Sequence, residues 1–186
     1  MPTYTIFAGV NGAGKTSIYR SIYYNENKYE KRINTDEMVA RIGSWKNVDL
    51  QVKCAREAVR LIKKYIDEGI SFNQETTLCG NSIIRNIKSA KEKGFYIVMN
   101  YVGVDNSEIA KERVRIRVSK GGHGIADKDI ERRYYDSLEN LKRIIDICDE
   151  INIYDNSNMF REIINIEDGN IIWKSDKIPE WIKIIL

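Results

Sequence analysis

An eight-residue stretch near the start of the chain, Gly9-Val10-Asn11-Gly12-Ala13-Gly14-Lys15-Thr16, has the residue types and the spacing that bind phosphate. Glycines at its first and sixth positions let successive backbone N–H groups turn inward around an anion, which a Cβ would obstruct. Lys15 supplies a cation for the β- and γ-phosphates, and the Thr16 hydroxyl is a ligand for Mg²⁺. A helix that begins at Gly14 or Lys15 adds the positive end of its dipole. This phosphate cradle predicts nucleotide binding but does not reveal the fate of the γ-phosphate.

We expect nucleotide contacts along the whole cradle and at the first residue after it. The residues concerned are Gly9, Asn11, Gly12, Ala13, Gly14, Lys15, Thr16 and Ser17. The alternative is a glycine-rich turn between a strand and a helix that binds no ligand. The order of apolar strand, loop and Gly-Lys-Thr argues against that alternative.

Two acidic positions follow predicted strands, where they would face the cradle. Transfer of a γ-phosphoryl group to a hydroxyl requires a carboxylate that orients or deprotonates the acceptor. Asp36 is our candidate for this general base, and a carboxylate that only stabilises a helix N-terminus is the alternative. Glu75 and Thr76 are expected either to hold the acceptor or a metal-bound water, or to cap the next turn.

Five arginines flank a glycine-rich tip, Gly121-Gly122-His123-Gly124, on two predicted helices, as expected of a lid that closes over phosphates. They are Arg113, Arg115, Arg117, Arg132 and Arg133. An arginine inserted toward the transferred group is worth roughly 10³–10⁵ in rate. We assign Arg117 and Arg133 to the transition state, and Arg113 and Arg132 to substrate binding. For some of the five, the alternative is a solvated helix face with intrahelical pairs, such as Arg132 or Arg133 with Asp136.

His123 is the only histidine in the chain, so neither a histidine metal cluster nor a histidine-based catalytic triad can form. Its position at the glycine-rich tip predicts a contact with substrate or phosphate, with simple exposure as the alternative. The tryptophans at positions 45, 173 and 181 are interpreted as packing residues. The run Arg132-Arg133-Tyr134-Tyr135 indicates a helix that buries Tyr134 more than it indicates a nucleic-acid surface.

Alternating strand and helix patterns predict the elements that bring these residues together. Strands are expected at 4–8, 29–33, 70–75, 95–104 and 151–154, with a hairpin over 160–173 that turns at Asp168-Gly169. Helices are expected at 16–24, 36–42, 48–68, 82–93, 107–119 with Ser107 as N-cap, 127–148, and from 179 to the end. This order indicates an α/β fold of the P-loop NTPase type, with a central, mostly parallel sheet and helices on both faces. Ligands of such sheets bind at the carboxyl ends of the strands.

The composition fits a single domain over residues 1–186, with a helical lid at about 107–147. A net charge of +3, from 30 basic and 27 acidic side chains, argues against nucleic acid as a partner. Three widely spaced cysteines indicate neither a disulfide framework nor a zinc site. No apolar run approaches the length of a membrane span, and the first strand leaves no room for a signal peptide. We therefore expect a cytoplasmic protein with no membrane partner.

The cradle and several distant motifs together resemble the zeta toxin family. The matching segments are Phe7–Thr16, Asn34-Thr35-Asp36, Phe72–Thr77, Arg113-Val114, Arg117–His123, Arg132-Arg133-Tyr134, Leu138–Leu141 and Tyr154–Ser157. The resemblance implies a P-loop kinase in which Lys15 and Thr16 hold ATP and Mg²⁺, Asp36 is the base, and lid arginines complete the clamp. It also implies that Tyr154–Ser157 lies near the adenine, so that Asn156 contacts the nucleotide.

The resemblance limits the class of acceptor substrate without identifying the acceptor. The family's best-known substrate is UDP-N-acetylglucosamine, phosphorylated on the sugar's 3′-hydroxyl, usually by a toxin that a small antitoxin neutralises. This chain is shorter than the larger zeta toxins and has Ile125-Ala126 where related sequences often have Val-Pro. It is more similar to a compact branch often labelled predicted ATPase or kinase, and related enzymes are thought to phosphorylate nucleotide cofactors such as NAD. Asn34 and Glu75 are the substrate-binding positions expected to govern that choice.

The leading hypothesis is an ATP-dependent kinase for UDP-N-acetylglucosamine or a related nucleotide conjugate, with an antitoxin as a candidate partner. A regulatory ATPase that acts through a protein partner is one alternative, and a NAD-directed or polynucleotide kinase is another. A transport ATPase is disfavoured because no Leu-Ser-Gly-Gly signature follows the cradle.

Overall fold

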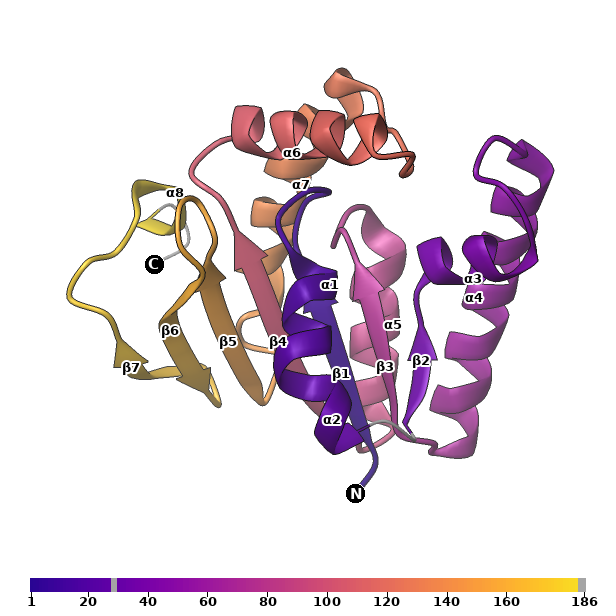
Figure 1. The fold of residues 1–186 in the computed structure, drawn as a ribbon. Helices are drawn as coiled ribbons and strands as arrows, with labels where there is room; N and C mark the ends of the chain where they lie inside the picture. The colour runs from indigo at the N-terminus through magenta and orange to yellow at the C-terminus, as the bar shows by residue number, and fades with distance from the viewer. Residues whose placement is uncertain (28–29, 184–186) are drawn as a thin grey trace.

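The computed structural model describes residues 1–27 and 30–183. Its centre is a seven-stranded sheet with the strand order β2-β3-β1-β4-β5-β6-β7 (Figure 1). The strands are β1 (Thr3–Ala8), β2 (Lys31–Ile33), β3 (Phe72–Thr76), β4 (Tyr96–Gly103), β5 (Glu150–Asp155), β6 (Arg161–Glu167) and β7 (Asn170–Lys174). Strands β1 to β5 are parallel, and β6 and β7 extend the sheet in antiparallel fashion. This topology confirms the predicted α/β fold with a C-terminal hairpin.

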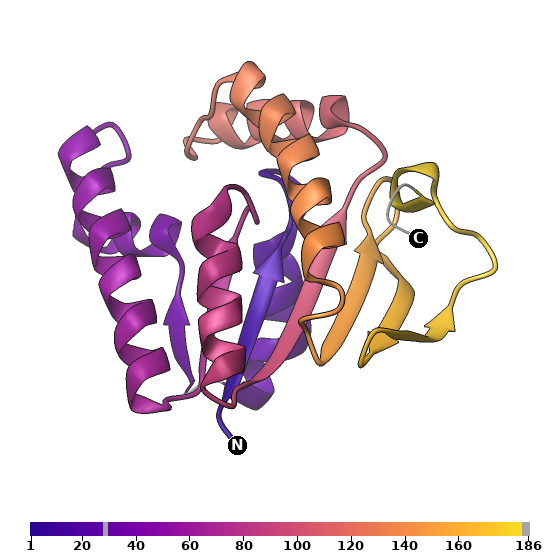
Figure 2. The ribbon, with the colours of Figure 1, turned by 180° about the vertical axis from the view of Figure 1, so that it is seen from behind.

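Helices cover both faces of the sheet, as predicted. On the face seen in Figure 1 lie α1 (Lys15–Ile18), a π-helical segment η1 (Tyr19–Tyr23) and α2 (Tyr24–Asn27). On the face seen in Figure 2 lie α4 (Val48–Glu68), α5 (Asn81–Glu92) and α7 (Asp127–Ile144). The remaining helices are α3 (Thr35–Ile42), α6 (Ser107–Ser119) and α8 (Glu180–Lys183).

The core lies between the sheet and these two helical layers. Ile6, Met99 and Ile151 stand in register on β1, β4 and β5 and are fully buried. On the opposite face, Phe7 packs edge to face against Tyr19 of η1. Parallel strands covered on both faces read as apolar runs, which is why β4 could be recognised from the sequence.

Several element ends differ from the prediction. The helix expected at 16–24 runs to Asn27 through η1, whose wider turn is not visible in the apolar spacing. Asn106 rather than Ser107 caps α6, because its side-chain oxygen accepts a hydrogen bond from Ile109 N at 3.1 Å. The helix expected to reach residue 148 ends at Ile144, where the chain turns to bring the next residues into β5. The expected strand start at residue 29 and the helix end at 184–186 lie outside the described residues.

Helix α6 and the start of α7, which belong to the segment predicted as a lid, lie over the carboxyl edge of the sheet, above the cradle (Figure 1). Lys111 of α6 joins the two helices through ion pairs with Glu108 and with Glu131 of α7, at 2.7 and 2.8 Å. Gly43 and Gly69 end α3 and α4, and Gly69 adopts φ 65° at the end of α4. Within residues 1–27 and 30–183, no helix combines the length and apolarity needed to cross a bilayer.

Candidate active site

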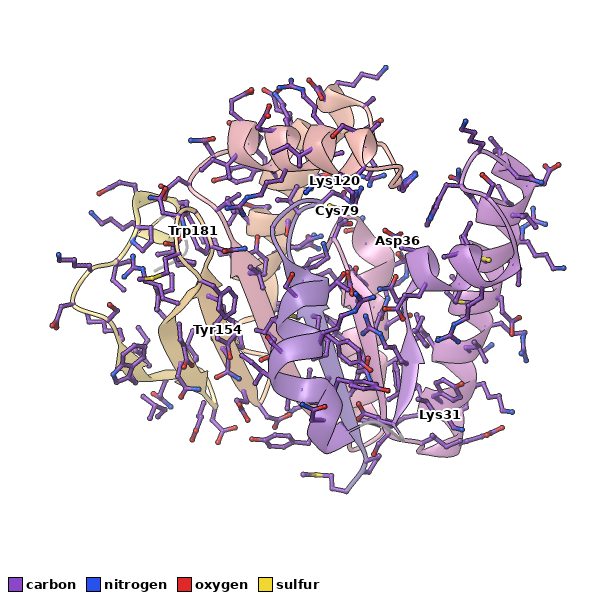
Figure 3. The ribbon with its side chains drawn as sticks, in the orientation of Figure 1. Lys31, Asp36, Cys79, Lys120, Tyr154 and Trp181 are labelled. Atoms are coloured by element: carbon purple, nitrogen blue, oxygen red, sulfur yellow. The ribbon has the colours of Figure 1, made fainter. Side chains whose placement is uncertain are left out.

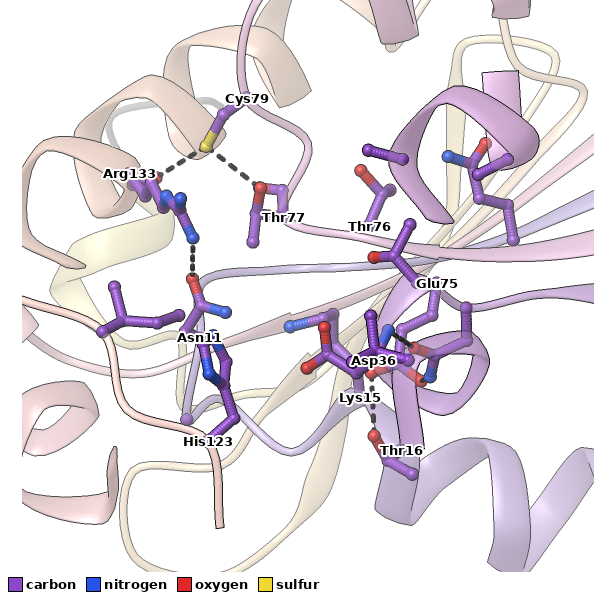
Figure 4. Close-up of a pocket in the computed structure, with 18 of the residues that line it drawn as sticks. Asn11, Lys15, Thr16, Asp36, Glu75, Thr76, Thr77, Cys79, His123 and Arg133 are labelled. Carbon is purple, nitrogen blue, oxygen red and sulfur yellow. Dashed lines mark hydrogen bonds between the residues drawn. The ribbon is translucent and has the colours of Figure 1, made fainter. Parts of the chain in front are cut away.

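A cavity of about 880 Å³ lies at the carboxyl edge of the sheet, between the cradle, the lid helices and the α3–α4 region (Figure 4). Most of the residues predicted for the site line it. They are Asn11, Gly12, Gly14, Lys15, Thr16, Ser17, Asn34, Asp36, Glu75, Thr76, Arg113, Arg117, His123, Arg132 and Arg133. The converging strand ends therefore bring together segments that are more than 100 residues apart in the sequence.

The cradle is wedged between β4 and α6, and its glycines are required there. A Cβ at Gly9, where φ is +136°, would lie 2.2 Å from the carbonyl oxygen of Val102. A Cβ at Gly12, where φ is +84°, would lie 2.6 Å from the carbonyl oxygen of Ala110. These contacts leave no room for a side chain, so the cradle holds one backbone shape.

Asn156 supports the cradle from the loop after β5. Its Nδ2 donates to the carbonyl oxygen of Ala13 at 2.7 Å, and a Cβ at Gly14 would lie 2.6 Å from the same nitrogen. Ala13 itself is fully buried. The structure thus places the Asn156 amide on the cradle backbone.

Lys15 is a buried cation that faces two carboxylates. It is 8% exposed, and its Nζ donates to the carbonyl oxygen of Val10 at 3.1 Å. Burial lowers the pKa of Lys15, whereas the negative charges of Glu75 and Asp36 act in the opposite direction. Figure 4 shows Lys15 beside both carboxylates and Thr16.

The carboxylate of Glu75 is held by three donors. Its Oε1 accepts from Thr16 Oγ1 at 2.7 Å, and its Oε2 accepts from Arg32 Nη2 at 2.7 Å and from Asn34 Nδ2 at 2.8 Å. Arg32, on β2, also pairs with Glu37 through two nitrogens. Sequence reasoning did not identify Arg32, because a single arginine on a short strand has no recognisable spacing.

Asp36 lies in the first turn of α3, directly after the residue that caps the helix. Asn34 Oδ1 accepts hydrogen bonds from the backbone N–H groups of Asp36 at 2.9 Å and Glu37 at 3.3 Å. The same Asn34 side chain donates to Glu75, so it couples the helix start to β3. No described residue forms a hydrogen bond or an ion pair with the Asp36 carboxylate, which lines the cavity. Asp36 is therefore available to an acceptor hydroxyl.

Two lid arginines carry buried nitrogens that lack a partner among the described residues. Arg113 Nη2 donates to the carbonyl oxygen of Ser157 at 3.1 Å, and Arg117 Nε donates to that of His123 at 2.9 Å. One further nitrogen of each group, Arg113 Nη1 and Arg117 Nη2, is buried without a hydrogen bond to any described residue. Buried guanidinium donors are costly unless an acceptor satisfies them. Both side chains line the cavity, where a phosphate would supply that acceptor.

Of the other three arginines, one contacts the cradle and two form exposed ion pairs. Arg133 Nη1 donates to Asn11 Oδ1 of the cradle at 3.0 Å, which links α7 to the phosphate loop. Arg132 is exposed and pairs with Asp129 and Asp136 on its own helix, as the alternative interpretation expected. Arg115 is also exposed and pairs with acidic residues of α6 and of the α7 start.

His123 stacks on Trp45 across the mouth of the cavity. The ring centroids lie 3.9 Å apart with an interplanar angle of 23°. Trp45 belongs to the α3–α4 loop, so the stack joins the lid to the opposite wall. Burial lowers the pKa of His123, and the positive charges of Arg117 and Arg133 act in the same direction. Trp45 was interpreted as a packing residue, and the structure instead places it in the lining of the cavity.

One face of α4 forms a wall of the cavity that sequence reasoning missed. The residues on this wall are Gln51, Val52, Ala55 and Ala58, and Val39 of α3 adjoins them. Their spacing of three and four residues was visible, but it reads equally well as a core face. Ala55 and Ala58 were the signal available in the sequence, because small side chains on a helix face leave space for a ligand beside that helix.

Thr76 and Cys79 complete the strand end near the lid. Thr76 Oγ1 accepts a hydrogen bond from Leu78 N at 3.1 Å, so it stabilises the following turn, as one of its two interpretations expected. Cys79 Sγ donates to the carbonyl oxygens of Thr77 and Arg133, both at 3.4 Å. Burial raises the pKa of the Cys79 thiol.

Comparison with known proteins agrees with this geometry. The family model described as zeta toxin matches residues 1–167. An uncharacterized protein from Haemophilus influenzae is 37% identical over 128 residues, which cover 69% of this chain and 89% of that protein.

Two solved structures share the fold at low sequence identity. A chain of the AvrRxo1-ORF1:ORF2 complex with ATP superposes with a TM-score of 0.74 at 14% identity, over 99% of this chain and 62% of that chain. The present chain thus spans less than two thirds of that neighbour. A chain of the PezAT chromosomal toxin–antitoxin system of Streptococcus pneumoniae gives a TM-score of 0.63 at 16% identity, over 100% and 77% of the two chains. With the family model matching residues 1–167, the chain belongs to the zeta toxin family.

Proposed function

We propose that the protein is an ATP-dependent kinase that transfers a γ-phosphoryl group to a hydroxyl of a small molecule. The observation that carries this proposal is the placement of three features around one cavity: the cradle, the Asp36 carboxylate and two arginines of α6. Among the described residues, the carboxylate has no hydrogen-bond partner and each of the two arginines has a buried nitrogen without one. The family match and the kinase-like fold support it. Each part needed for phosphoryl transfer therefore has a candidate.

The reaction assigns one role to each group. The cradle and Lys15 hold the β- and γ-phosphates of ATP, and Arg113 and Arg117 stabilise the charge that develops on the equatorial oxygens. Asp36 accepts the proton of the acceptor hydroxyl as its oxygen bonds to the γ-phosphorus. The bond to the β–γ bridging oxygen breaks at the same time, and ADP leaves. Arg133, fixed on Asn11, adds positive charge at the cradle.

The residues around Thr16 fit Mg²⁺, which prefers hydroxyl and carboxylate oxygens. Thr16 would hold the ion, and Glu75, 2.7 Å from the Thr16 hydroxyl, would orient that ligand. When bound, Mg²⁺ would neutralise charge on the β- and γ-phosphates. Among the described residues there is no cluster of three or more acidic, cysteine or histidine side chains. Such a site suits an ion that takes its other ligands from phosphate and water.

The acceptor we propose is UDP-N-acetylglucosamine or a related nucleotide conjugate. The cavity volume of about 880 Å³ lies in the upper part of the usual range for ligand pockets, as two substrates would require. Ala55 and Ala58 of α4 line the same cavity as Asp36, and their small side chains leave room for the body of the acceptor. NAD is the next acceptor to consider, because it has the same combination of nucleotide and sugar hydroxyls.

A regulatory ATPase that acts through a protein partner is the second candidate. It is favoured by the toxin–antitoxin complex among the structural neighbours. The same neighbour supports our proposal that an antitoxin binds this protein. We also propose a cytoplasmic location, where ATP and nucleotide sugars are available.

The proposal is tested by incubating the protein with ATP, Mg²⁺ and single acceptors. The panel contains UDP-N-acetylglucosamine, other nucleotide sugars and NAD, and mass spectrometry detects the product. We expect one acceptor to gain a single phosphate with an equal yield of ADP. ATP hydrolysis at the same rate with and without every acceptor, and no phosphorylated product, would favour the regulatory ATPase.

A further inference from the structure

The C-terminal helix α8 lies against the carboxyl ends of β4 and β5, beyond residues 1–167 that the family model matches (Figure 3). Its Trp181 is 3% exposed. We infer that Trp181 is a positioning residue for ATP, because it fixes a loop that holds both the cradle and a lid arginine. This inference rests on the proposed function, since it concerns the same ATP site.

The indole of Trp181 occupies a space that β4 leaves open at its last residue. A Cβ at Gly103 would lie 2.2 Å from Cη2 of the indole, so glycine is required there. The ring also lies 6.1 Å from that of Tyr101, between centroids. This packing holds the indole at the end of β4. Asp155 of β5 lies beside it, because Asp155 and Gly103 are paired in the sheet register.

The indole N–H donates to a buried carboxylate that organises the next two residues. Trp181 Nε1 lies 3.2 Å from Asp155 Oδ1, and Asp155 is 5% exposed. The same oxygen accepts from Ser157 Oγ at 2.6 Å and from Ser157 N at 3.3 Å. The indole is thus one of the donors that satisfy the carboxylate, together with the two groups of Ser157 that fix the loop and with Arg161 Nε, 3.5 Å from Oδ2.

The loop then makes contact with both halves of the proposed ATP site. Asn156 Nδ2 donates to the carbonyl oxygen of Ala13 in the cradle at 2.7 Å. The carbonyl oxygen of Ser157 accepts from Arg113 Nη2 at 3.1 Å, and Arg113 Nη1 is the buried nitrogen left without a partner. A shift of this loop would therefore move the cradle and redirect the guanidinium group together.

The test compares two conservative substitutions in the C-terminal segment. W181F keeps an aromatic ring but removes the N–H donor, and W173F changes an exposed tryptophan of β7 as the matched control. Isothermal titration with ATP and Mg²⁺ measures the dissociation constant of each folded protein. We expect W181F to raise the dissociation constant about threefold to tenfold, the usual effect of one hydrogen bond, and W173F to leave it unchanged.

A double-mutant cycle with R113A separates positioning from general loss of stability. If Trp181 acts through the loop on Arg113, W181F has a smaller effect in the R113A background than in the wild type. Wild-type ATP affinity in folded W181F would overturn the inference. Absence of ATP binding by the wild-type protein would instead overturn the proposed function.

S157A serves if W181F does not fold. This change removes the hydroxyl that joins Asp155 to the loop and leaves the indole in place. We expect the same rise in the ATP dissociation constant and the same dependence on Arg113. An unchanged dissociation constant for S157A would contradict the inference that Trp181 acts on the ATP site through Asp155 and the loop.

Discussion

The carboxylates of Asp36 and Glu75 lie at neighbouring strand ends but have different contacts. Glu75 accepts hydrogen bonds from Thr16, Arg32 and Asn34, whereas no described residue binds the Asp36 carboxylate. The oxygens of Glu75 are already occupied by these three donors, whereas both oxygens of Asp36 are left to a ligand in the cavity by the described residues. This difference supports Asp36 as the base and Glu75 as a group that positions Thr16.

Replacement of Lys15 by methionine should separate stability from function. Because burial lowers the pKa of Lys15, burial disfavours its charged form, and removal of the charge relieves that cost. We expect K15M to keep a melting temperature at or above that of the wild type, while its ATP dissociation constant rises about 10–100-fold. Differential scanning calorimetry and isothermal titration measure the two effects. A large fall in melting temperature would show that Lys15 is mainly a structural residue.

The protonation of His123 should report on ATP binding. In the folded protein burial holds the pKa of His123 below its ordinary value of 6.5. The free energy that neutral His123 contributes to folding is therefore present in full above pH 6.5. It is lost as the pH falls through the lower pKa that His123 has in the folded state. Bound phosphates should raise this pKa, since negative charge favours the imidazolium. NMR titration can follow the single histidine directly, and an unchanged pKa with ATP bound would place the nucleotide away from the lid.

At the residue scale, the sequence identified side chains that a local motif defines. It did not identify side chains whose contacts arise only from tertiary packing. Lys15 and Asp36 could be assigned because a loop pattern and a strand end predict their surroundings. Trp45 could not, because its contact with His123 depends on how the α3–α4 loop approaches the lid. The contact between Arg32 and Glu75 likewise arises from strand pairing.

At the element scale, the lid helices separate arginines that face the cavity from arginines on solvated surfaces. We expect R113A and R117A to reduce transfer by roughly 10³-fold or more, as loss of a transition-state arginine does. R115A is the matched control on α6, and it should change the rate less than about threefold because Arg115 forms exposed pairs away from the cavity. Steady-state kinetics with the identified acceptor measures all three variants. A loss for R115A equal to those for R113A and R117A would contradict the assignment.

Element boundaries were predictable where a local pattern determines them. The bounds of α4 and α6 agree with the expected 48–68 and 107–119, because apolar periodicity and glycine stops define both helices. The end of α7 was placed too late, since its final turn is replaced by the connection to β5. Nor could the sequence show that one face of α4 lines a cavity, because a buried core face has the same spacing.

At the scale of the whole molecule, strand order brings the distant motifs together. The sequence predicted a parallel sheet, but the order β2-β3-β1-β4-β5 depends on long-range pairing that no local pattern contains. This order places β3 and β4 on either side of β1, so that Glu75 and the lid flank the cradle. The convergence of site residues was expected from the rule for strand ends, while their partners required the structure.

ATP should stabilise the folded state, because a ligand that binds only the native protein adds to its free energy of unfolding. At an ATP concentration 100-fold above the dissociation constant, ligand binding adds about 2.7 kcal/mol to the free energy of unfolding. For a chain of this size, we expect the melting temperature to rise by about 5–10 °C. Thermal unfolding monitored by circular dichroism measures the shift, with K15M as the control, whose shift at the same ATP concentration should be about half as large or smaller. No shift in the wild type would mean that the cradle does not bind ATP.

The most direct test of the central claim is the effect of D36N on transfer and on ATP binding. The isosteric amide keeps the size of the side chain but cannot take the acceptor proton. With the acceptor that the wild type phosphorylates, we predict a fall in transfer rate of roughly 10²–10⁴-fold and an unchanged ATP dissociation constant. Wild-type transfer by D36N, with ATP still bound, would contradict the assignment of Asp36 as the general base of a kinase.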